Sequence, residues 1–237
     1  MHSARFPANI NRRQENNRPE MKKKQEKEPF SWPAVKPGLF IVFEGIDGCG
    51  KSTQVELLAK RLRRRREKVV TLSEPTAGRW GQKIREAARH QDSLSPAQEL
   101  ELFIKDRKED IKNNIKPALE SGQIVILDRY FYSTLAYQGA RGLDPDEIRS
   151  KHKQFVLRPN IVFILDVPVT VALKRIASRP VIYRLFEDRY YLQKVRKNFL
   201  SLKDPECCLL DGRQPPEVIS RQIWRILTRR FPWLKAV

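Results

Sequence analysis

Residues 45–52 form a candidate phosphate-binding loop. They read Gly-Ile-Asp-Gly-Cys-Gly-Lys-Ser and match the pattern Gly-x-x-x-x-Gly-Lys-Ser/Thr at every fixed position. Glycines in such a loop let backbone N–H groups turn toward a phosphate, and the N-terminus of the following helix adds partial positive charge. In this arrangement Lys51 reaches the outer phosphates and the Ser52 hydroxyl binds Mg²⁺. The pattern therefore predicts a nucleoside triphosphate site.

The segments on either side of the loop support this prediction. Residues 39–43 are a short, continuous apolar run, as expected of a buried parallel strand. After the loop, Val55, Leu58, Ala59 and Leu62 recur at the spacing of one helix face. A strand, a glycine loop and a helix in this order are what phosphate binding requires. A glycine-rich turn without a ligand is the weaker alternative.

A carboxylate and an arginine follow a later apolar run, residues 124–127. Asp128 occupies the place where a phosphate-loop enzyme keeps a second carboxylate that organises Mg²⁺. We therefore take Ser52 and Asp128 as candidate metal ligands, although an Asp here also suits a cap of the next helix. Arg129 could grip a second phosphate with two hydrogen bonds, and a structural salt bridge is its alternative.

A second arginine lies within an apolar helix face. The residues that share this face are Leu100, Phe103, Arg107, Ile111 and Ala118. A buried arginine is costly unless it is paired or meets an anion or a base. Phe103, one turn earlier, could stack on a planar ring while Arg107 binds the ring edge or a phosphate. Taken alone, Phe103 fits an ordinary core residue.

The helix after Arg129 carries a group of polar side chains. Ser133 and Tyr137 are four residues apart, and Thr134 and Tyr137 are three apart, so they share a face. With Gln138, they are expected to cluster near Arg129.

The elements that must position these residues alternate between short apolar runs and helical segments. The expected strands are 39–43, 69–72, 124–127, 161–165 and 207–210. The expected helices are 54–66, 79–90, 96–120, 131–140, 145–157, 169–178, 187–202 and 216–230. This alternation predicts an α/β fold, a five-stranded parallel sheet between two layers of helices. Each strand is followed by a polar or charged residue, so these residues should meet at the carboxyl edge, where ligands bind.

Charge is spread over the whole chain of 237 residues. The net charge is +19, of which +5 falls in residues 1–37 and +14 in the remainder. Such a field attracts phosphorylated ligands and also allows non-specific binding of nucleic acid, which we do not favour. Residues 1–37 are polar and interrupted by proline, and we expect a disordered extension there. We expect residues 38–237 to form one domain.

Cysteine content and hydropathy bear on the compartment. The three cysteines, Cys49, Cys207 and Cys208, are too few for a disulfide framework. No apolar stretch approaches the roughly 18 residues of a membrane span, and the first 30 residues lack the apolar centre of a secretory signal. The sequence therefore favours the cytoplasm and gives no sign of a membrane partner.

Six segments together resemble the thymidylate kinase family of P-loop nucleoside monophosphate kinases. They are residues 43–54, Glu74-Pro75, Phe103-x-x-x-Arg107, residues 115–119, Asp128-Arg129-Tyr130 and residues 133–138. Their order and spacing are similar to those of the family from about residue 39 to 200. The resemblance implies Mg²⁺-dependent transfer of the γ-phosphoryl group of ATP to dTMP, which gives dTDP. It also implies a homodimer.

The resemblance implies roles for individual residues. ATP would be bound by Gly45, Ile46, Asp47, Gly48, Cys49, Gly50, Lys51, Ser52 and Thr53. The substrate would be bound by Glu74, Pro75, Phe103, Arg107, Arg129, Ser133, Thr134, Tyr137 and Gln138. Catalytic roles would fall to Lys51, Asp47, Arg129 and Arg184, the last on a lid after the fourth strand. In this set Phe103 stacks on thymine, Arg107 contacts its edge and Arg129 holds the acceptor phosphate.

Two alternatives and one departure accompany this resemblance. A deoxynucleoside kinase, or a broader monophosphate kinase, could use the same scaffold; a nucleoside kinase would need Glu44 or Asp128 as a general base. A nucleotide-dependent, RNA-associated protein is the alternative without catalysis. The departure is Ser73, because many family members have Arg before the Glu-Pro pair.

Overall fold

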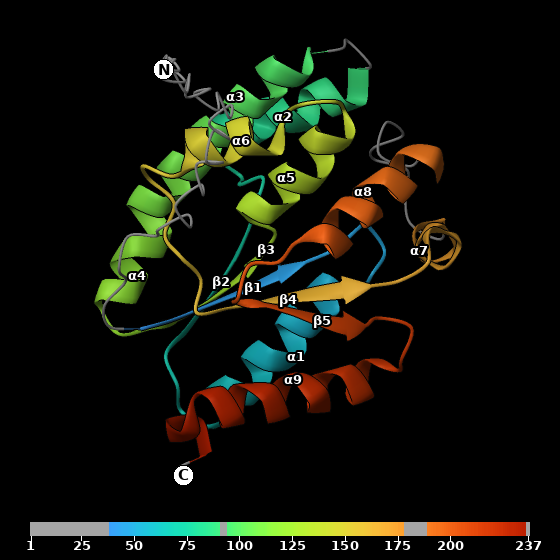
Figure 1. Ribbon diagram of the computed structural model, residues 1–237. Coiled ribbons are helices and arrows are strands. Elements are labelled where there is room, and N and C mark those ends of the chain that lie inside the picture. The colour runs from blue at the N-terminus through green and yellow to red at the C-terminus, as the bar shows by residue number, and fades with distance from the viewer. Residues whose placement is uncertain (1–37, 91–93, 178–188, 236–237) are drawn as a thin grey trace, which may run out of the picture. The chain divides into compact units, whose positions relative to one another are not determined.

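A computed structural model of the chain describes residues 38–90, 94–177 and 189–235. Five parallel strands form one sheet, in the order β2-β3-β1-β4-β5 (Figure 1). The strands are β1 (Leu39–Glu44), β2 (Val69–Ser73), β3 (Ile124–Asp128), β4 (Ile161–Asp166) and β5 (Cys207–Asp211). All five predicted strands are confirmed. Each extends one residue beyond its apolar run, and that residue is polar in every case.

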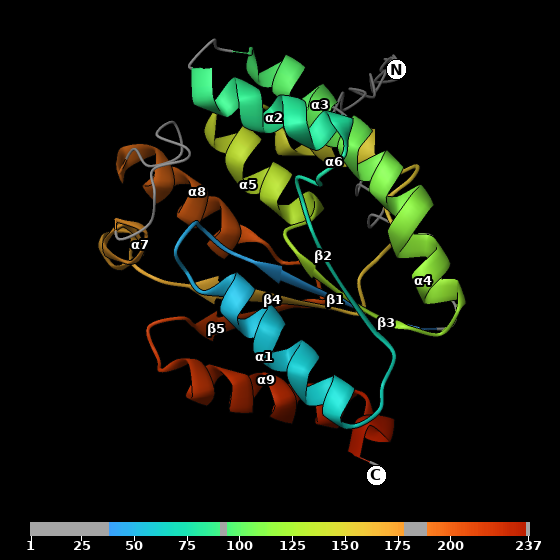
Figure 2. The same cartoon turned by 180° about the vertical axis from the view of Figure 1, so that it is seen from behind.

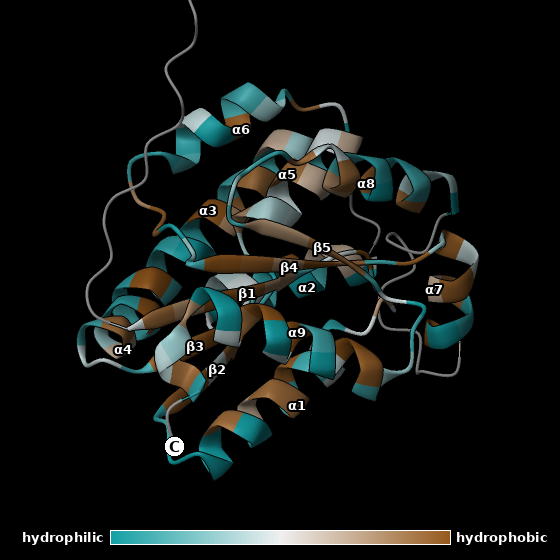
Figure 3. Ribbon diagram, turned by 60° about the horizontal axis from the view of Figure 1, so that its bottom comes forward, coloured by the Kyte–Doolittle hydropathy of each residue, from teal (hydrophilic) through white to brown (hydrophobic). Residues whose placement is uncertain are grey.

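The central strand shows why an apolar run identified it. All six residues of β1 are buried, because β1 pairs with β3 on one side and β4 on the other and helices cover both faces. The edge strands β2 and β5 are only partly buried. Figure 3 shows mostly hydrophobic strand ribbons and a mostly hydrophilic α6 (Pro145–His152).

Helices cover both faces of the sheet, which confirms the predicted three layers. On one face α1 (Lys51–Arg64) lies beside α9 (Pro216–Arg230), and on the other α5 (Phe131–Ala140) lies beside α8 (Arg189–Ser201) (Figures 1 and 2). The other helical segments are α2 (Arg79–His90), α3 (Pro96–Asp110), a π-helical turn (Ile111–Ile115), α4 (Lys116–Glu120), α7 (Val169–Ile176) and a 3₁₀ turn (Pro232–Lys235).

Four predicted helices end earlier in the structure than predicted. Helix α7 ends at Ile176, not at residue 178, and helix α8 ends at Ser201, not at residue 202. Helix α1 ends at Arg64, not at residue 66, because Arg66 has a φ of 63° in the left-handed region. Helix α6 ends at His152, not at residue 157. The N–H groups of Phe155 and Val156 both donate to the carbonyl of His152, and that of Leu157 donates to the Tyr130 hydroxyl. The Phe155 bond is an i→i−3 bond of a tight turn, and the Leu157 N–H bonds a side chain in place of a helical carbonyl, so the regular helix does not continue.

The predicted helix 96–120 is helical throughout and is divided by the π turn. It starts at a capping box, since the Ser95 hydroxyl accepts from the Gln98 N–H and the Gln98 side chain accepts from the Ser95 N–H. No helix in the described part of the chain is long and apolar enough to cross a membrane. The expectations for residues 1–37 fall outside the described ranges, as does the start of the predicted helix 187–202.

Candidate active site

The candidate phosphate loop lies between β1 and α1, at the carboxyl edge of the sheet. Helix α1 begins at Lys51, three residues earlier than predicted, so the loop runs directly into the first helical turn. Gly48 has a φ of 79°, and a Cβ there would lie 2.4 Å from the carbonyl oxygen of Ala172. Only glycine fits this position, for reasons of both conformation and space.

The Lys51 ammonium lies within the curve of this loop. Its Nζ donates to the carbonyls of Gly45 and Ile46, both at 3.1 Å, and the residue is only 6% exposed. The Cys49 thiol is fully buried 3.7 Å from the same Nζ. Burial raises the pKa of this thiol, so it is neutral in the loop. The loop therefore presents one cation where negative charge would be bound.

Ser52 and Asp128 meet although 76 residues separate them. The Ser52 hydroxyl donates to Asp128 Oδ2 at 2.7 Å. Both are hard oxygen donors, the type that Mg²⁺ prefers, and Mg²⁺ usually takes only one or two protein ligands and completes its shell with phosphates and water. No cluster of three or more His, Cys, Asp or Glu side chains suited to a metal occurs among the described residues. The Ser52–Asp128 pair thus fits Mg²⁺ brought in with a nucleotide.

Asp47 and Arg129 form an ion pair beside the loop. Arg129 NH2 lies 2.6 Å from Asp47 Oδ1, and the Tyr137 hydroxyl donates to Asp47 Oδ2 at 2.9 Å. Burial raises the pKa of Asp47, but the charges of Arg129 and Lys51 outweigh it and hold that pKa at about 2. Arg129 has a φ of 71°, which is uncommon for a residue with a side chain. This backbone turn aims the guanidinium at the loop.

Glu44, at the end of β1, fixes the start of α5. Its Oε1 accepts from the Tyr130 N–H at 2.8 Å and the Ser133 N–H at 3.1 Å, and its Oε2 accepts from the Ser133 hydroxyl at 2.6 Å. Burial raises the pKa of Glu44, and the bond from Ser133 and the charge of Arg129 offset part of that rise. Glu44 thereby acts as the helix cap of α5, from a neighbouring strand.

Two cavities adjoin these residues. The first has a volume of about 160 Å³ and is lined by Asp47, Gly48, Gly50, Lys51, Ser52, Thr53, Ser73, Glu74, Asp128 and Arg129. The second has a volume of about 210 Å³ and is lined by Asp47, Pro75, Ile84, Arg85, Ala88, Phe103, Arg129, Ser133, Thr134, Tyr137 and Gln138. We call them the loop cavity and the apolar cavity. They share Asp47 and Arg129, so one ion pair stands where the two meet.

Arg107 lies behind the apolar cavity and is 1% exposed. Its Nε and NH2 both donate to Glu74 Oε2, at 2.8 and 2.5 Å, and its NH1 donates to the Thr134 hydroxyl at 3.1 Å and lies 2.8 Å from His152 Nε2. Among the described residues that line the two cavities, Arg107 does not occur, so it lines neither. Burial and the Arg107 charge lower the pKa of His152 to about 3, so this imidazole is neutral.

Three predicted ATP-binding residues that the structure describes, Gly45, Ile46 and Cys49, line neither cavity. Arg184, the proposed lid arginine, lies outside the described residues. Within the loop, the side chains of Ile46 and Cys49 are buried. Arg175, which also lies after the fourth strand, donates from NH1 to the Gly212 carbonyl at 3.0 Å, beside the loop.

Three lining residues, Ile84, Arg85 and Ala88, were not predicted. They lie on α2, where Ala88 is four residues after Ile84 and three after Arg85 and so neighbours both on the helix surface. Arg85 donates to the carbonyls of Pro75 and Thr76, at 2.9 and 2.5 Å. An arginine on this face, soon after the Glu-Pro pair, is the signal that could have identified them.

Comparison with known proteins finds a family model and relatives that carry the same description. The sequence model described as "Thymidylate kinase" matches residues 43–223. The chain is 43% identical over 203 residues to the thymidylate kinase of Akkermansia muciniphila, which covers 86% of this chain and 98% of that protein. It is 41% identical over 186 residues to the thymidylate kinase of Brachyspira hyodysenteriae, covering 78% and 91%. It is 39% identical over 189 residues to the probable thymidylate kinase of Archaeoglobus fulgidus, covering 80% and 94%.

Proposed function

The chain belongs to the thymidylate kinase family, and from this premise we propose that it transfers the γ-phosphoryl group of ATP to dTMP and forms dTDP. One observation carries the proposal beyond family membership. The loop cavity, which Lys51 and Ser52 line, and the apolar cavity, which Phe103 and Tyr137 line, share the Asp47–Arg129 pair. Two nucleotides placed in these cavities would bring their phosphates together at this point.

We propose that ATP binds with its phosphates in the loop cavity, against residues 45–53. Lys51 would neutralise the outer phosphates, and its ammonium already lies inside the loop. Ser52 and Asp128 would hold the metal of the Mg–ATP complex, because their paired oxygens fit that ion. When bound, Mg²⁺ stabilises the charge that develops on the transferred group.

We propose that dTMP binds in the apolar cavity. Phe103 presents a ring on which thymine could stack, and Pro75, Ser133 and Thr134 line the same space. Tyr137 would lie under the sugar and Gln138 beside the base. Glu74 would act from the wall of the loop cavity, with Arg107 behind it.

Transfer of the phosphoryl group would depend mainly on position and on charge. The acceptor phosphate is itself an anionic oxygen nucleophile, so the reaction needs no general base. Arg129 would exchange part of its contact with Asp47 for the acceptor phosphate and hold it in line with the triphosphate. Arg184 is proposed to add positive charge to the transferred group from the lid.

We further propose a homodimer in the cytoplasm, with reduced cysteines. The homodimer follows from family resemblance alone. For the compartment, Cys49, Cys207 and Cys208 are all unpaired, as expected in a reducing environment.

Turnover of ATP to ADP with Mg²⁺ tests the proposal. The acceptors to compare are dTMP, dUMP, UMP, CMP, AMP and thymidine, with Lys51→Ala as the control for contaminating kinases. We expect fast turnover with dTMP and a loss of at least 100-fold in Lys51→Ala. Preference for thymidine would assign the chain to the nucleoside kinases. Absence of turnover with every acceptor would refute an enzymatic function.

A further inference from the structure

The side-chain amide of Gln138 is hydrogen-bonded at only one of its two ends. Gln138 is 1% exposed and lines the apolar cavity. Its Nε2 donates to Glu99 Oε2 at 3.0 Å, whereas its carbonyl oxygen Oε1 is buried without a hydrogen-bond partner among the described residues. Buried polar atoms are almost always hydrogen-bonded. Oε1 is therefore an acceptor for which a ligand of the cavity could supply the donor.

Glu99 determines which end of this amide faces it. A carboxylate accepts hydrogen bonds and donates none, so it selects the NH₂ end of Gln138 and leaves the carbonyl end for the cavity. Glu99 lies on α3 and is 8% exposed. Turning the amide over would place two acceptor oxygens against each other and leave the NH₂ group without Glu99 as its acceptor.

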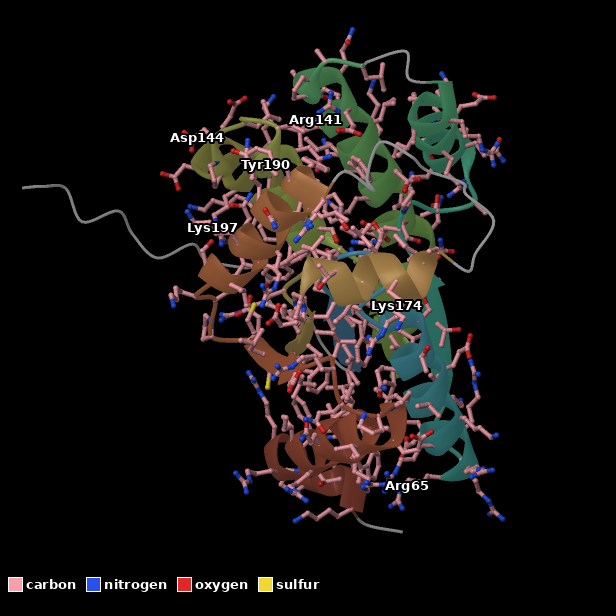
Figure 4. The ribbon with its side chains drawn as sticks, turned by 90° about the vertical axis from the view of Figure 1, so that its right-hand side faces the viewer. Arg65, Arg141, Asp144, Lys174, Tyr190 and Lys197 are labelled. Atoms are coloured by element: carbon pink, nitrogen blue, oxygen red, sulfur yellow. The ribbon has the colours of Figure 1, made fainter. Side chains whose placement is uncertain are left out.

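Arg141 in turn fixes Glu99. Its NH1 lies 2.6 Å from Glu99 Oε2, and its NH2 donates to the carbonyl of Leu94 at 2.9 Å. Arg141, labelled in Figure 4, is the C-cap residue of α5, the helix that carries Gln138. The chain Arg141–Glu99–Gln138 thus connects α5 and α3 and ends at the cavity.

We propose that Glu99 is a positioning residue for base selection: it holds the Gln138 amide so that Oε1 accepts the N3–H of a thymine or uracil ring. Cytosine has a lone pair at N3 and would face Oε1 as acceptor against acceptor. A site that hydrogen-bonds one base rejects an analogue that leaves its buried polar groups unpaired. This inference rests on the proposed function, because it takes the apolar cavity as the pyrimidine site.

The test compares dUMP with dCMP, which differ only at N3 and the 4-position. The ratio of their kcat/KM values is measured for the wild type, Glu99→Gln, Gln138→Met and the double variant. A glutamine at 99 offers both a donor and an acceptor, so Gln138 can turn over and keep one hydrogen bond. Glu101→Gln is the matched control, since Glu101 lies on the same helix and pairs with Lys151 at the exposed surface.

We expect the ratio of kcat/KM for dUMP to that for dCMP to fall about tenfold in Glu99→Gln. This is the effect expected from the loss of one well-oriented hydrogen bond. Glu101→Gln should keep the wild-type ratio. In the Gln138→Met background, Glu99→Gln should cause no further fall, because the amide it orients is gone. An unchanged ratio in Glu99→Gln would overturn the proposal, since a purely structural role lowers kcat/KM for both substrates alike. An equal fall of the ratio with and without Gln138 would also overturn it, because Glu99 would then not act through that amide.

Calorimetric Kd values for the two monophosphates, measured without ATP, separate this inference from the proposed function. A wild-type chain that binds dUMP over dCMP, with this preference lost in Glu99→Gln, supports the positioning role even if no phosphate is transferred. Equal binding of both monophosphates by the wild type would overturn it. If Glu99→Gln does not fold, Arg141→Gln replaces it, because that variant frees Glu99 and should lower the same ratio.

Discussion

Glu44→Gln distinguishes two roles for a buried carboxylate beside the candidate site. Glu44 is 0% exposed, and three donors at the start of α5 converge on it. A kinase that phosphorylates a neutral 5′-hydroxyl would need such a carboxylate as a general base. A kinase whose acceptor is a phosphate needs no base, and Glu44 then serves only to cap α5 and to hold Ser133 next to Arg129.

The hydrogen bonds give the size of each expected effect. In Glu44→Gln the amide oxygen keeps the bonds from the Tyr130 and Ser133 N–H groups, and the amide NH₂ faces the Ser133 hydroxyl, which can rotate to accept. What is lost is charge assistance, so we expect the free energy of unfolding to fall by about 1–2 kcal/mol. Glu44→Ala removes both acceptor oxygens and should cost about 2–4 kcal/mol, since two buried N–H groups lose their partners.

The assay combines unfolding with kinetics. For a domain of this size, the loss in Glu44→Gln corresponds to a fall in Tm of about 3–6 °C. Turnover with dTMP should stay within about threefold of the wild type, because the base-free reaction leaves Glu44 no proton to take. If Glu44→Gln instead slows turnover by about 100-fold or more with little change in Tm, this reasoning is refuted and Glu44 is assigned to general base catalysis.

Three further predictions concern the metal pair, the acceptor arginine and a buried histidine. Ser52→Ala and Asp128→Asn should each lower kcat about 100-fold in Mg²⁺ titrations. The double variant should lower it little further, because both residues act on one ion. Ser52→Thr, which keeps the hydroxyl, is the control. Arg129→Lys should lower kcat/KM for dTMP about 100-fold or more while the Kd for ATP changes only a few-fold, since an ammonium cannot replace a bidentate guanidinium; equal losses for both nucleotides would contradict this role. The pKa of His152 is lowered to about 3 from an ordinary 6.5, so protons bind the unfolded chain and stability falls as pH falls through this window. Between pH 7.5 and 5, urea unfolding should show the wild type losing about 2 kcal/mol more than His152→Gln, and parallel pH curves would exclude the effect.

The elements of the fold were predictable because their signals are local. The buried strands β1, β3 and β4 are apolar up to their last residue, since helices cover the sheet on both faces. The predicted helix starts at residues 96 and 145 are confirmed, and Ser95 and Asp144 there each cap within the first turn of their own helix. Helix ends were less predictable, since the end of α6 depends on a bond from Leu157 to the distant Tyr130 hydroxyl.

The candidate site was predictable in its chemistry and only partly in its contacts. Residues at strand ends were expected to meet, and Ser52 with Asp128 and Asp47 with Arg129 do so. The position of Glu99 was not predictable, because its partners lie 39 and 42 residues away on another helix. Sequence periodicity places a residue on a helix face, and tertiary structure decides which side chain it meets there.

Arg107 shows what the sequence can and cannot predict about a buried arginine. An arginine within an apolar stripe predicts only that its charge is met, and the structure identifies Glu74 as the partner. A guanidinium has five N–H donors, and four are directed at Glu74, Thr134 and His152. His152 can accept one of them because its Nδ1 faces the Ile148 carbonyl and its Nε2 is left as the acceptor. One N–H of NH2 therefore remains, so this buried network leaves Arg107 at most one further hydrogen bond to give.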